Sequence, residues 1–189
     1  MEPKKVFTDA GLLSGGRTLL GGMWGFCLVD ENDEVVTLQS GLMVPRDHEI
    51  ATVEINLVET YAVLLALEYT VAQWPGWSGE VLLDNNNARK RFCEPSPWGG
   101  VPDAIRLRCH AALKRCGPLR FTLLAGHPTP ADLAQGFRVR SSGNPYPVSR
   151  HNVAVDLACC QERDAWQAVH DPRKAKKTTP APLALQGSL

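Results

Sequence analysis

The strongest constraint on the fold is a long helical pattern between two short apolar runs. Each run is followed directly by an aspartate. Residues 6–8 lead into Asp9, and residues 81–83 lead into Asp84. Between them, residues 54–73 are rich in Ala, Leu, Glu and Val and hold neither Gly nor Pro, which favours a helix. A strand, a long helix and a second strand in succession predict a sheet covered by helices.

The rest of the chain extends this pattern. The polar residues 30–33 separate two apolar segments and predict a hairpin, so we expect three antiparallel strands at the N-terminal end. The other expected elements are strands at 23–29, 34–42 and 119–124 and helices at 85–92, 103–115 and 152–168. The order βββαβααβα predicts an α/β protein whose five-stranded mixed sheet has helices packed on both faces.

The length of 189 residues suits one domain and a tail. We expect one folded domain over residues 1–170. Within it, residues 128–150 are rich in Pro, Gly and Ser and are expected to be an inserted loop with some local helix. Residues 171–189 lack apolar periodicity and are expected to be a disordered C-terminal tail.

Composition excludes several classes of protein. The 20 Lys and Arg balance 20 Asp and Glu, so the chain is not a broadly basic nucleic-acid binder. Neither an unbroken apolar stretch of membrane-span length nor an apolar signal segment is evident, so we expect a cytoplasmic, monomeric protein without membrane contact. The six cysteines form no C-x-x-C pair, which favours reduced thiols over a structural zinc site.

Four acids lie in apolar surroundings. Asp9 and Asp84 follow apolar runs, Glu59 lies on the apolar stripe of the long helix, and Asp156 lies among Val, Leu and Ala. Each alone would be an ordinary strand-end or surface carboxylate, but their joint placement favours one shared divalent cation, with Mg²⁺ or Mn²⁺ preferred over Zn²⁺ by oxygen ligands. Glu68 comes nine residues after Glu59, which places it about half a turn away around the helix, and it is interpreted as structural.

These residues resemble the motifs of type 1 ribonuclease H in order and in setting. The resemblance covers residues 6–168, and the ordered set of Asp, Glu, Asp, His, Asn and Asp is more specific than any single motif. The matching segments are residues 7–11, residues 22–28, Glu59 with Glu68, residues 81–86, Gly126 with His127, and Asn152 with Asp156.

The resemblance implies a ribonuclease H-like fold and a Mg²⁺-dependent endonuclease that hydrolyses the RNA strand of an RNA–DNA hybrid and leaves 5′-phosphate ends. Two Mg²⁺ ions, with Mn²⁺ as a possible substitute, would bracket the scissile phosphate. By position, Asp9 would bridge both ions, Glu59 and Asp84 would complete the leaving-group site, and Asp156 would complete the water-activating site.

The same resemblance implies a set of substrate-binding residues. Asn56 and Asn86 align with amides that read the sugar edges of the hybrid, although each is also a plausible helix-start or N-cap residue. Asn152 belongs to the last-helix motif and is expected near the substrate. Apart from the resemblance, the charge distribution adds Arg106 and Arg108, which lie in a segment rich in bases and are expected to hold phosphates.

Two histidines are candidates for the proton-transferring residue of the family. His127 follows Gly126 and the expected fifth strand, as in the Gly-His motif, and we favour it. His151 lies five residues before Asp156 and is the alternative. Without a functional role, His127 would be a solvated loop residue and His151 a helix-start residue.

The chain departs from the family pattern in three places. Ala125 replaces the lysine that often precedes Gly-His, and residues 94–102 hold no Lys or Arg, so the basic substrate-gripping protrusion of many bacterial members is lacking. His127 and Asp156 are 29 residues apart instead of roughly ten. The intervening Arg138, Arg140 and Arg150 are expected either to contact phosphates or to belong to a mobile insertion.

Two other functions fit the same residues. One is a DNA-directed nuclease or resolvase of the same fold, which the Gly-His and Asn-x-x-x-Asp motifs disfavour. The other is a hybrid-binding module without catalysis, which the presence of all four acids gives no reason to prefer.

Overall fold

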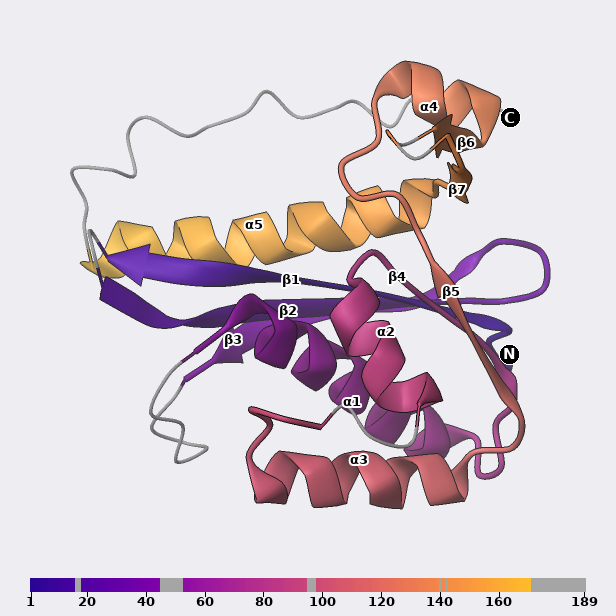
Figure 1. Ribbon diagram of the computed structural model, residues 1–189, viewed down its shortest axis with the longest axis horizontal. Coiled ribbons are helices and arrows are strands. Elements are labelled where there is room, and N and C mark those ends of the chain that lie inside the picture. Colours follow the sequence, from indigo (N-terminus) through magenta and orange to yellow (C-terminus); the bar gives the residue numbers. More distant parts are fainter. Residues whose placement is uncertain (16–17, 45–52, 95–97, 140, 142, 171–189) are drawn as a thin grey trace.

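The computed structural model describes residues 1–15, 18–44, 53–94, 98–139, 141 and 143–170. Five strands form one sheet in the order β3-β2-β1-β4-β5 (Figure 1). The strands are β1 Lys5–Gly15, β2 Thr18–Val29, β3 Val35–Met43, β4 Gly79–Leu83 and β5 Leu119–Leu123. The main helices are α1 Ile55–Gln73, α2 Asn86–Cys93, α3 Asp103–Arg115 and α5 Arg150–His170.

The sheet is mixed, as predicted. β1 pairs antiparallel with β2, and β2 pairs antiparallel with β3, whereas β1–β4 and β4–β5 are parallel. The hairpin between β2 and β3 closes where the Asp30 N–H donates to the Glu34 carbonyl at 3.0 Å. The prediction of three antiparallel strands at the N-terminal end is therefore confirmed.

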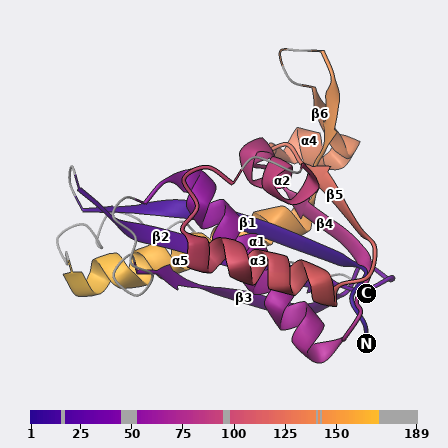
Figure 2. The ribbon, with the colours of Figure 1, turned by 60° about the horizontal axis from the view of Figure 1, so that its bottom comes forward.

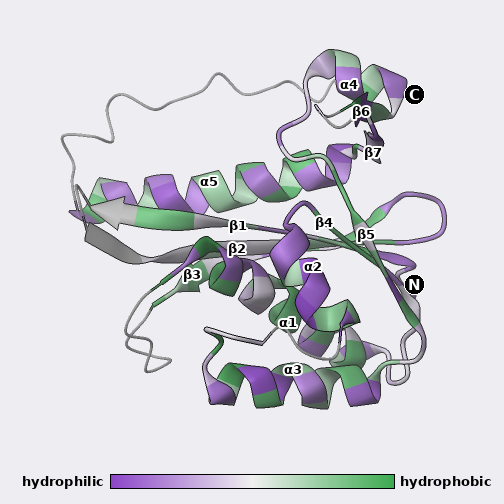
Figure 3. Ribbon diagram, in the orientation of Figure 1, coloured by the Kyte–Doolittle hydropathy of each residue, from purple (hydrophilic) through white to green (hydrophobic). Residues whose placement is uncertain are grey.

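Helices cover both faces of the sheet. Helices α1, α2 and α3 lie on one side and α5 lies on the other (Figure 1). Alternate strand residues face opposite ways, so Val6 packs into the core with α1, whereas its neighbour Phe7 packs into the core with Val155 and Cys159 of α5. In Figure 3, α3 and α5 alternate between hydrophobic and hydrophilic residues, as expected of helices with one face turned inward.

Helix α1 forms the centre of the larger core. By length and composition alone it is apolar enough to cross a membrane, but 67% of its apolar window is buried inside the protein. Such burial is typical of the core helix of a globular domain. Glu59 is among its buried residues, only 3% exposed.

The segment predicted as an inserted loop contains regular structure. Helix α4, Pro130–Gln135, is followed by the two-stranded sheet of β6, Phe137–Val139, and β7, Pro145–Pro147. Figure 2 shows β6 extending beyond the sheet and the other helices. Helix α5 ends at His170, and the expected tail at 171–189 lies outside the described residues.

Candidate active site

The relative lengths of β1 and β4 bring two aspartates level with each other. Phe7 is the last residue of β1 that pairs with β4, opposite Leu82, and β4 ends at Leu83. Two residues further along each parallel chain stand Asp9 and Asp84. The prediction that Asp9 ends its strand was wrong, because β1 continues past the end of β4 to Gly15 on the hydrogen bonds of β2.

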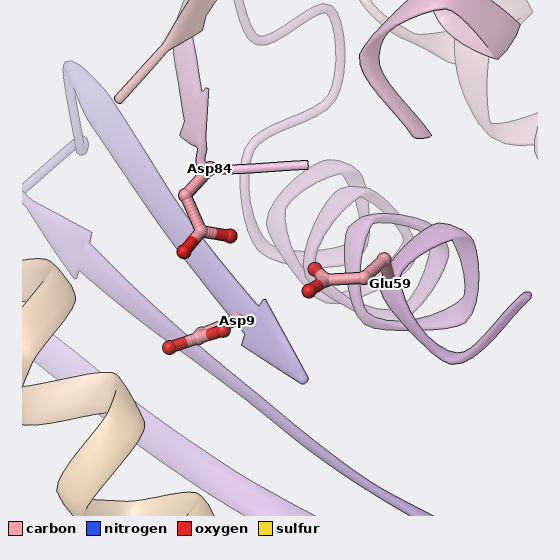
Figure 4. A group of neighbouring side chains, drawn as sticks. All are labelled: Asp9, Glu59 and Asp84. Carbon is pink, nitrogen blue, oxygen red and sulfur yellow. The ribbon is translucent and has the colours of Figure 1, made fainter. Parts of the chain in front are cut away.

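Glu59 of α1 completes a group of three carboxylates. One oxygen from each of Asp9, Glu59 and Asp84 lies within 4.8 Å of the others. Figure 4 shows the three side chains directed into one shared space from β1, α1 and the end of β4. Asp9 and Glu59 are buried, with 6% and 3% of their surface exposed.

Burial and mutual repulsion make this group costly to ionise. Burial, followed by the charges of Asp84 and Asp156, raises the pKa of Asp9 to about 8. Burial, followed by the charges of Asp9 and Asp84, raises the pKa of Glu59 well above its ordinary value. The buried Glu59 Oε2 has no hydrogen-bond partner among the described residues. A divalent cation between these oxygens would offset both costs, so the residues fit one.

Asp156 lies to one side of this group. It is on α5, its side chain is 40% exposed, and its charge acts on Asp9. A cavity of about 210 Å³ is shared by Asp9, His127, Pro128, Asn152, Val153 and Asp156. The fourth predicted acid therefore reaches the same cavity as Asp9, from the opposite side of the sheet to Glu59.

The two candidate histidines differ in environment. His127 Nδ1 is 4.0 Å from Asp156 Oδ2, and its side chain is 83% exposed. His151 is only 5% exposed, packs against the Phe7 ring at 5.2 Å between centroids, and has Nε2 3.1 Å from Asp33 Oδ2. The exposed histidine at the acids is His127, whereas His151 joins α5 to the β2–β3 turn.

An amide cluster borders the acids. Asn56 Oδ1 accepts hydrogen bonds from Asn85 Nδ2 at 3.1 Å and Asn87 Nδ2 at 3.4 Å. Asn86 Oδ1 instead accepts from the Arg89 guanidinium. The N-cap of α2 is Asn85 and not Asn86, because Asn85 Oδ1 accepts a hydrogen bond from the Ala88 N–H. Sequence reasoning missed Asn85 and Asn87, although the run of three asparagines after Asp84 was a signal.

Asn152 is a further buried amide. It is 3% exposed, and its Oδ1 has no hydrogen-bond partner among the described residues. Because it lines the cavity of Asp9 and Asp156, it has an unused acceptor beside the acids.

The two predicted phosphate-binding arginines have acidic partners. Arg108 donates two hydrogen bonds to Glu68, at 2.9 and 2.6 Å, and its guanidinium lies 5.8 Å from the centre of the Tyr61 ring. Arg106 pairs with Asp103 at 2.7 Å. The interpretation of Glu68 as structural fits its pairing with Arg108, which links α1 to α3.

Sequence reasoning also missed Arg91, which is only 8% exposed. Its guanidinium donates to the Asn56 carbonyl at 2.6 Å, to Thr60 Oγ1 at 2.7 Å and to the Gly99 carbonyl at 3.2 Å. These bonds fix the first turn of α1, and with it Asn56. No local sequence signal marks it, because Asn56 and Thr60 are 35 and 31 residues away along the chain.

Glycines of β2 let both helices that supply acids approach the sheet. A Cβ on Gly22 would lie 2.5 Å from the Cγ atoms of Val58, next to Glu59. A Cβ on Gly25 would lie 2.9 Å from Val155 Cγ1, next to Asp156. Gly126, which follows β5, likewise allows close approach to Asp84, since a Cβ on Gly126 would overlap Asp84 Oδ2. The glycines therefore set how closely the acids can gather.

No protein-family profile matches the sequence, and no curated protein matches it. Solved structures do resemble it. The N-terminal RNase H domain of a Mycobacterium tuberculosis protein is 12% identical, with a TM-score of 0.57 over 88% of this chain and 99% of that chain. The foamy virus RNase H domain is 13% identical, with a TM-score of 0.54 over 86% and 93%.

A third relative in structure is the compost-derived LC11-RNase H1 in complex with an RNA/DNA hybrid. It is 14% identical, with a TM-score of 0.51 over 83% of this chain and 96% of that chain. These neighbours share the sheet and helix arrangement derived above, and the predicted fold class is confirmed. The chain has the ribonuclease H-like fold.

Proposed function

We propose that the protein is a Mg²⁺-dependent endonuclease that hydrolyses the RNA strand of RNA–DNA hybrids and leaves 5′-phosphate ends. The observation that carries the proposal is the group of Asp9, Glu59 and Asp84, whose oxygens lie within 4.8 Å of one another, on a ribonuclease H-like fold. Asp156 adds a fourth carboxylate at the same cavity. Buried acids that repel one another are costly to fold and are typical of a functional site.

The proposed roles follow from where each side chain lies. Asp9, in the centre, would hold cations on both of its sides, with Glu59 and Asp84 on one and Asp156 on the other. Two bound Mg²⁺ ions would supply the activation of a water and the stabilisation of the leaving 3′-oxygen. His127, exposed beside Asp156, would exchange protons with solvent near the attacking water.

The substrate class rests on two supports. The structural neighbours include an RNase H1 in complex with an RNA/DNA hybrid. On this chain, Asn56 and its partners Asn85 and Asn87 form a hydrogen-bonded amide cluster next to Asp84. A side-chain amide can both donate to and accept from the 2′-OH that distinguishes RNA from DNA.

An assay with end-labelled substrates tests the proposal. With Mg²⁺, we expect cleavage of the RNA strand of a hybrid and no cleavage of duplex DNA or duplex RNA of the same sequence. EDTA should abolish it, and product ends should ligate as 5′-phosphates. The matched controls are Asp84→Asn, expected to be inactive, and Glu31→Gln, on an exposed glutamate of the β2–β3 turn, expected to be active.

The assay also separates the two alternatives. Cleavage of duplex or branched DNA without cleavage of hybrid would indicate a DNA-directed nuclease. Tight hybrid binding without cleavage, in Mg²⁺ and in Mn²⁺, would indicate a non-catalytic binding module. Either result would overturn the proposed activity.

A further inference from the structure

The insertion between β5 and α5 is fastened to the turn that carries His127. The Ala125 N–H donates to the Pro147 carbonyl at 2.9 Å, so the end of β7 returns to the end of β5. From β6, Arg138 Nη1 donates to the Gly126 and His127 carbonyls, each at 3.1 Å. One guanidinium therefore bridges two consecutive carbonyls of the turn.

Arg138 also forms an ion pair with Asp132 of α4. Its Nε lies 3.9 Å from Asp132 Oδ2. Asp132 is fixed by the capping box of α4, in which its carboxylate accepts from the Thr129 N–H and hydroxyl at 2.8 Å each. The described insertion thus forms a brace that runs from α4 through Arg138 to the histidine turn.

The turn needs such support. His127 has a φ of +47°, a left-handed conformation that costs free energy for a residue other than glycine. The same turn touches two acids, because Gly126 packs against Asp84 and His127 Nδ1 lies 4.0 Å from Asp156 Oδ2. A small change of the turn would therefore alter both ends of the acid group.

We propose that Arg138 is a positioning residue, whose guanidinium holds the Gly126–His127 turn in its left-handed conformation and keeps His127 beside Asp156. The proposal rests on the proposed hybrid cleavage. It differs from both sequence-based expectations for Arg138, a phosphate contact or a place in a mobile insertion, since Nη1 is directed to protein carbonyls. A planar guanidinium can serve two carbonyls and Asp132 together, which a lysine ammonium matches only in part.

Steady-state kinetics on a hybrid tests the role. For Arg138→Ala we expect kcat to fall about tenfold or more while KM changes less than about twofold, because positioning is lost and binding is kept. Arg138→Lys should recover part of kcat. The matched control is Arg120→Ala, on an arginine whose side chain is 79% exposed and which pairs with Glu80 at the far end of the sheet. Thermal unfolding should show all variants folded, since the Arg138 side chain is 42% exposed.

A higher KM at unchanged kcat would make Arg138 a phosphate contact and overturn the proposal, as would unchanged kinetics. A second measurement needs no activity. In ¹⁵N relaxation, backbone order parameters at Gly126 and His127 should fall from about 0.85 in the wild type to below about 0.6 in Arg138→Ala, and stay unchanged in Arg120→Ala. Absence of hybrid cleavage by the wild type would defeat the proposed function but leave this test intact, and unchanged order parameters would defeat the brace.

Discussion

At the scale of single residues, Asp9 and Glu59 occupy buried positions that lower the stability of the fold. Asp9 is in the middle of a buried strand, and Glu59 is on the core face of α1. Uncompensated carboxylates in such places destabilise a fold. We therefore expect these positions to trade stability for function.

Amide variants test this trade. Asp84→Asn should lower hybrid cleavage at least about 100-fold, since stabilisation by a bound metal is worth several kcal/mol. The same change should raise the urea midpoint of the metal-free protein, because it removes one charge from a self-repelling group. Glu31→Gln, on an exposed glutamate of the β2–β3 turn, is the control for both measurements. Wild-type cleavage by Asp84→Asn would contradict the assignment of the site.

Sequence patterns selected three acids that lie together in the structure, but they did not reveal the partners of the arginines. Asp9, Glu59 and Asp84 could be selected because each interrupts an apolar pattern. The ion pair of Arg108 with Glu68 could not be foreseen, because the partners are 40 positions apart and belong to different helices. Arg138 and Arg91 were equally hidden, since their acceptors are mostly backbone carbonyls that no sequence pattern marks.

The Arg108–Glu68 pair leads to a revised expectation. Arg108→Ala and Glu68→Gln should each lower the urea midpoint, and a double-mutant cycle should give a coupling of about 1 kcal/mol, as for a partly exposed pair with two hydrogen bonds. Arg106→Glu remains the test of phosphate binding and should raise KM more than it lowers kcat. If Arg108→Ala raised KM without a change in stability, its side chain would be a substrate contact after all.

At the scale of elements, β2 acts as a spacer between two helices. Gly22 faces α1 and Gly25 faces α5. Because neither residue has a side chain, both helices can approach β2 closely where Glu59 and Asp156 come near Asp9. The structure thereby explains why glycines belong to the motif at residues 22–28. The three-strand meander was predictable from its hairpin turn. Strands β6 and β7 were not, because each has only three residues and β7 is Pro-Tyr-Pro, which resembles a loop.

Alanine at either glycine should displace one helix. Gly22→Ala presses on Val58 and should weaken cleavage and lower stability by about 1–3 kcal/mol, the usual cost of overpacking. Adding Val58→Ala should restore part of both losses by making room. Gly99→Ala is the control, since a Cβ on Gly99 would meet no described neighbour within 4 Å. Partial recovery of cleavage and stability in the double variant would show that the losses arise from contact with Val58. No recovery would mean that Gly22 does not set the approach of α1.

At the scale of the whole molecule, the acid group makes the stability of the metal-free protein depend on pH. The folded pKa of Asp9 is about 8, against 3.8 as the ordinary value, so the folded state binds the proton more tightly than the unfolded state. That contribution to stability is complete below pH 4 and is lost as pH rises through 8. Glu59 shifts in the same direction.

In EDTA, the urea midpoint should therefore be lower at pH 8.5 than at pH 5.5. Asp9→Asn should flatten the difference, and the control Glu31→Gln should leave it unchanged. Mg²⁺ at pH 8.5 should raise the midpoint again, because a ligand of the folded state stabilises it. A midpoint that does not change with pH in the metal-free wild type would mean that neither burial nor mutual repulsion raises the pKa of Asp9 and Glu59.

The parallel pairing of β1 with β4 has a consequence for the order of folding. Phe7 and Leu82 are 75 positions apart, whereas β1 and β2 are joined by a short connection. Contacts between distant parts of a chain are slow to form, because a large loop must close first. The pairing of β1 with β4 is what brings Asp9 and Asp84 together. Their repulsion is therefore absent while the first hairpins form. We expect the repulsion to speed unfolding and to leave the folding rate almost unchanged, so the native state can hold a strained acid cluster without obstructing its own formation.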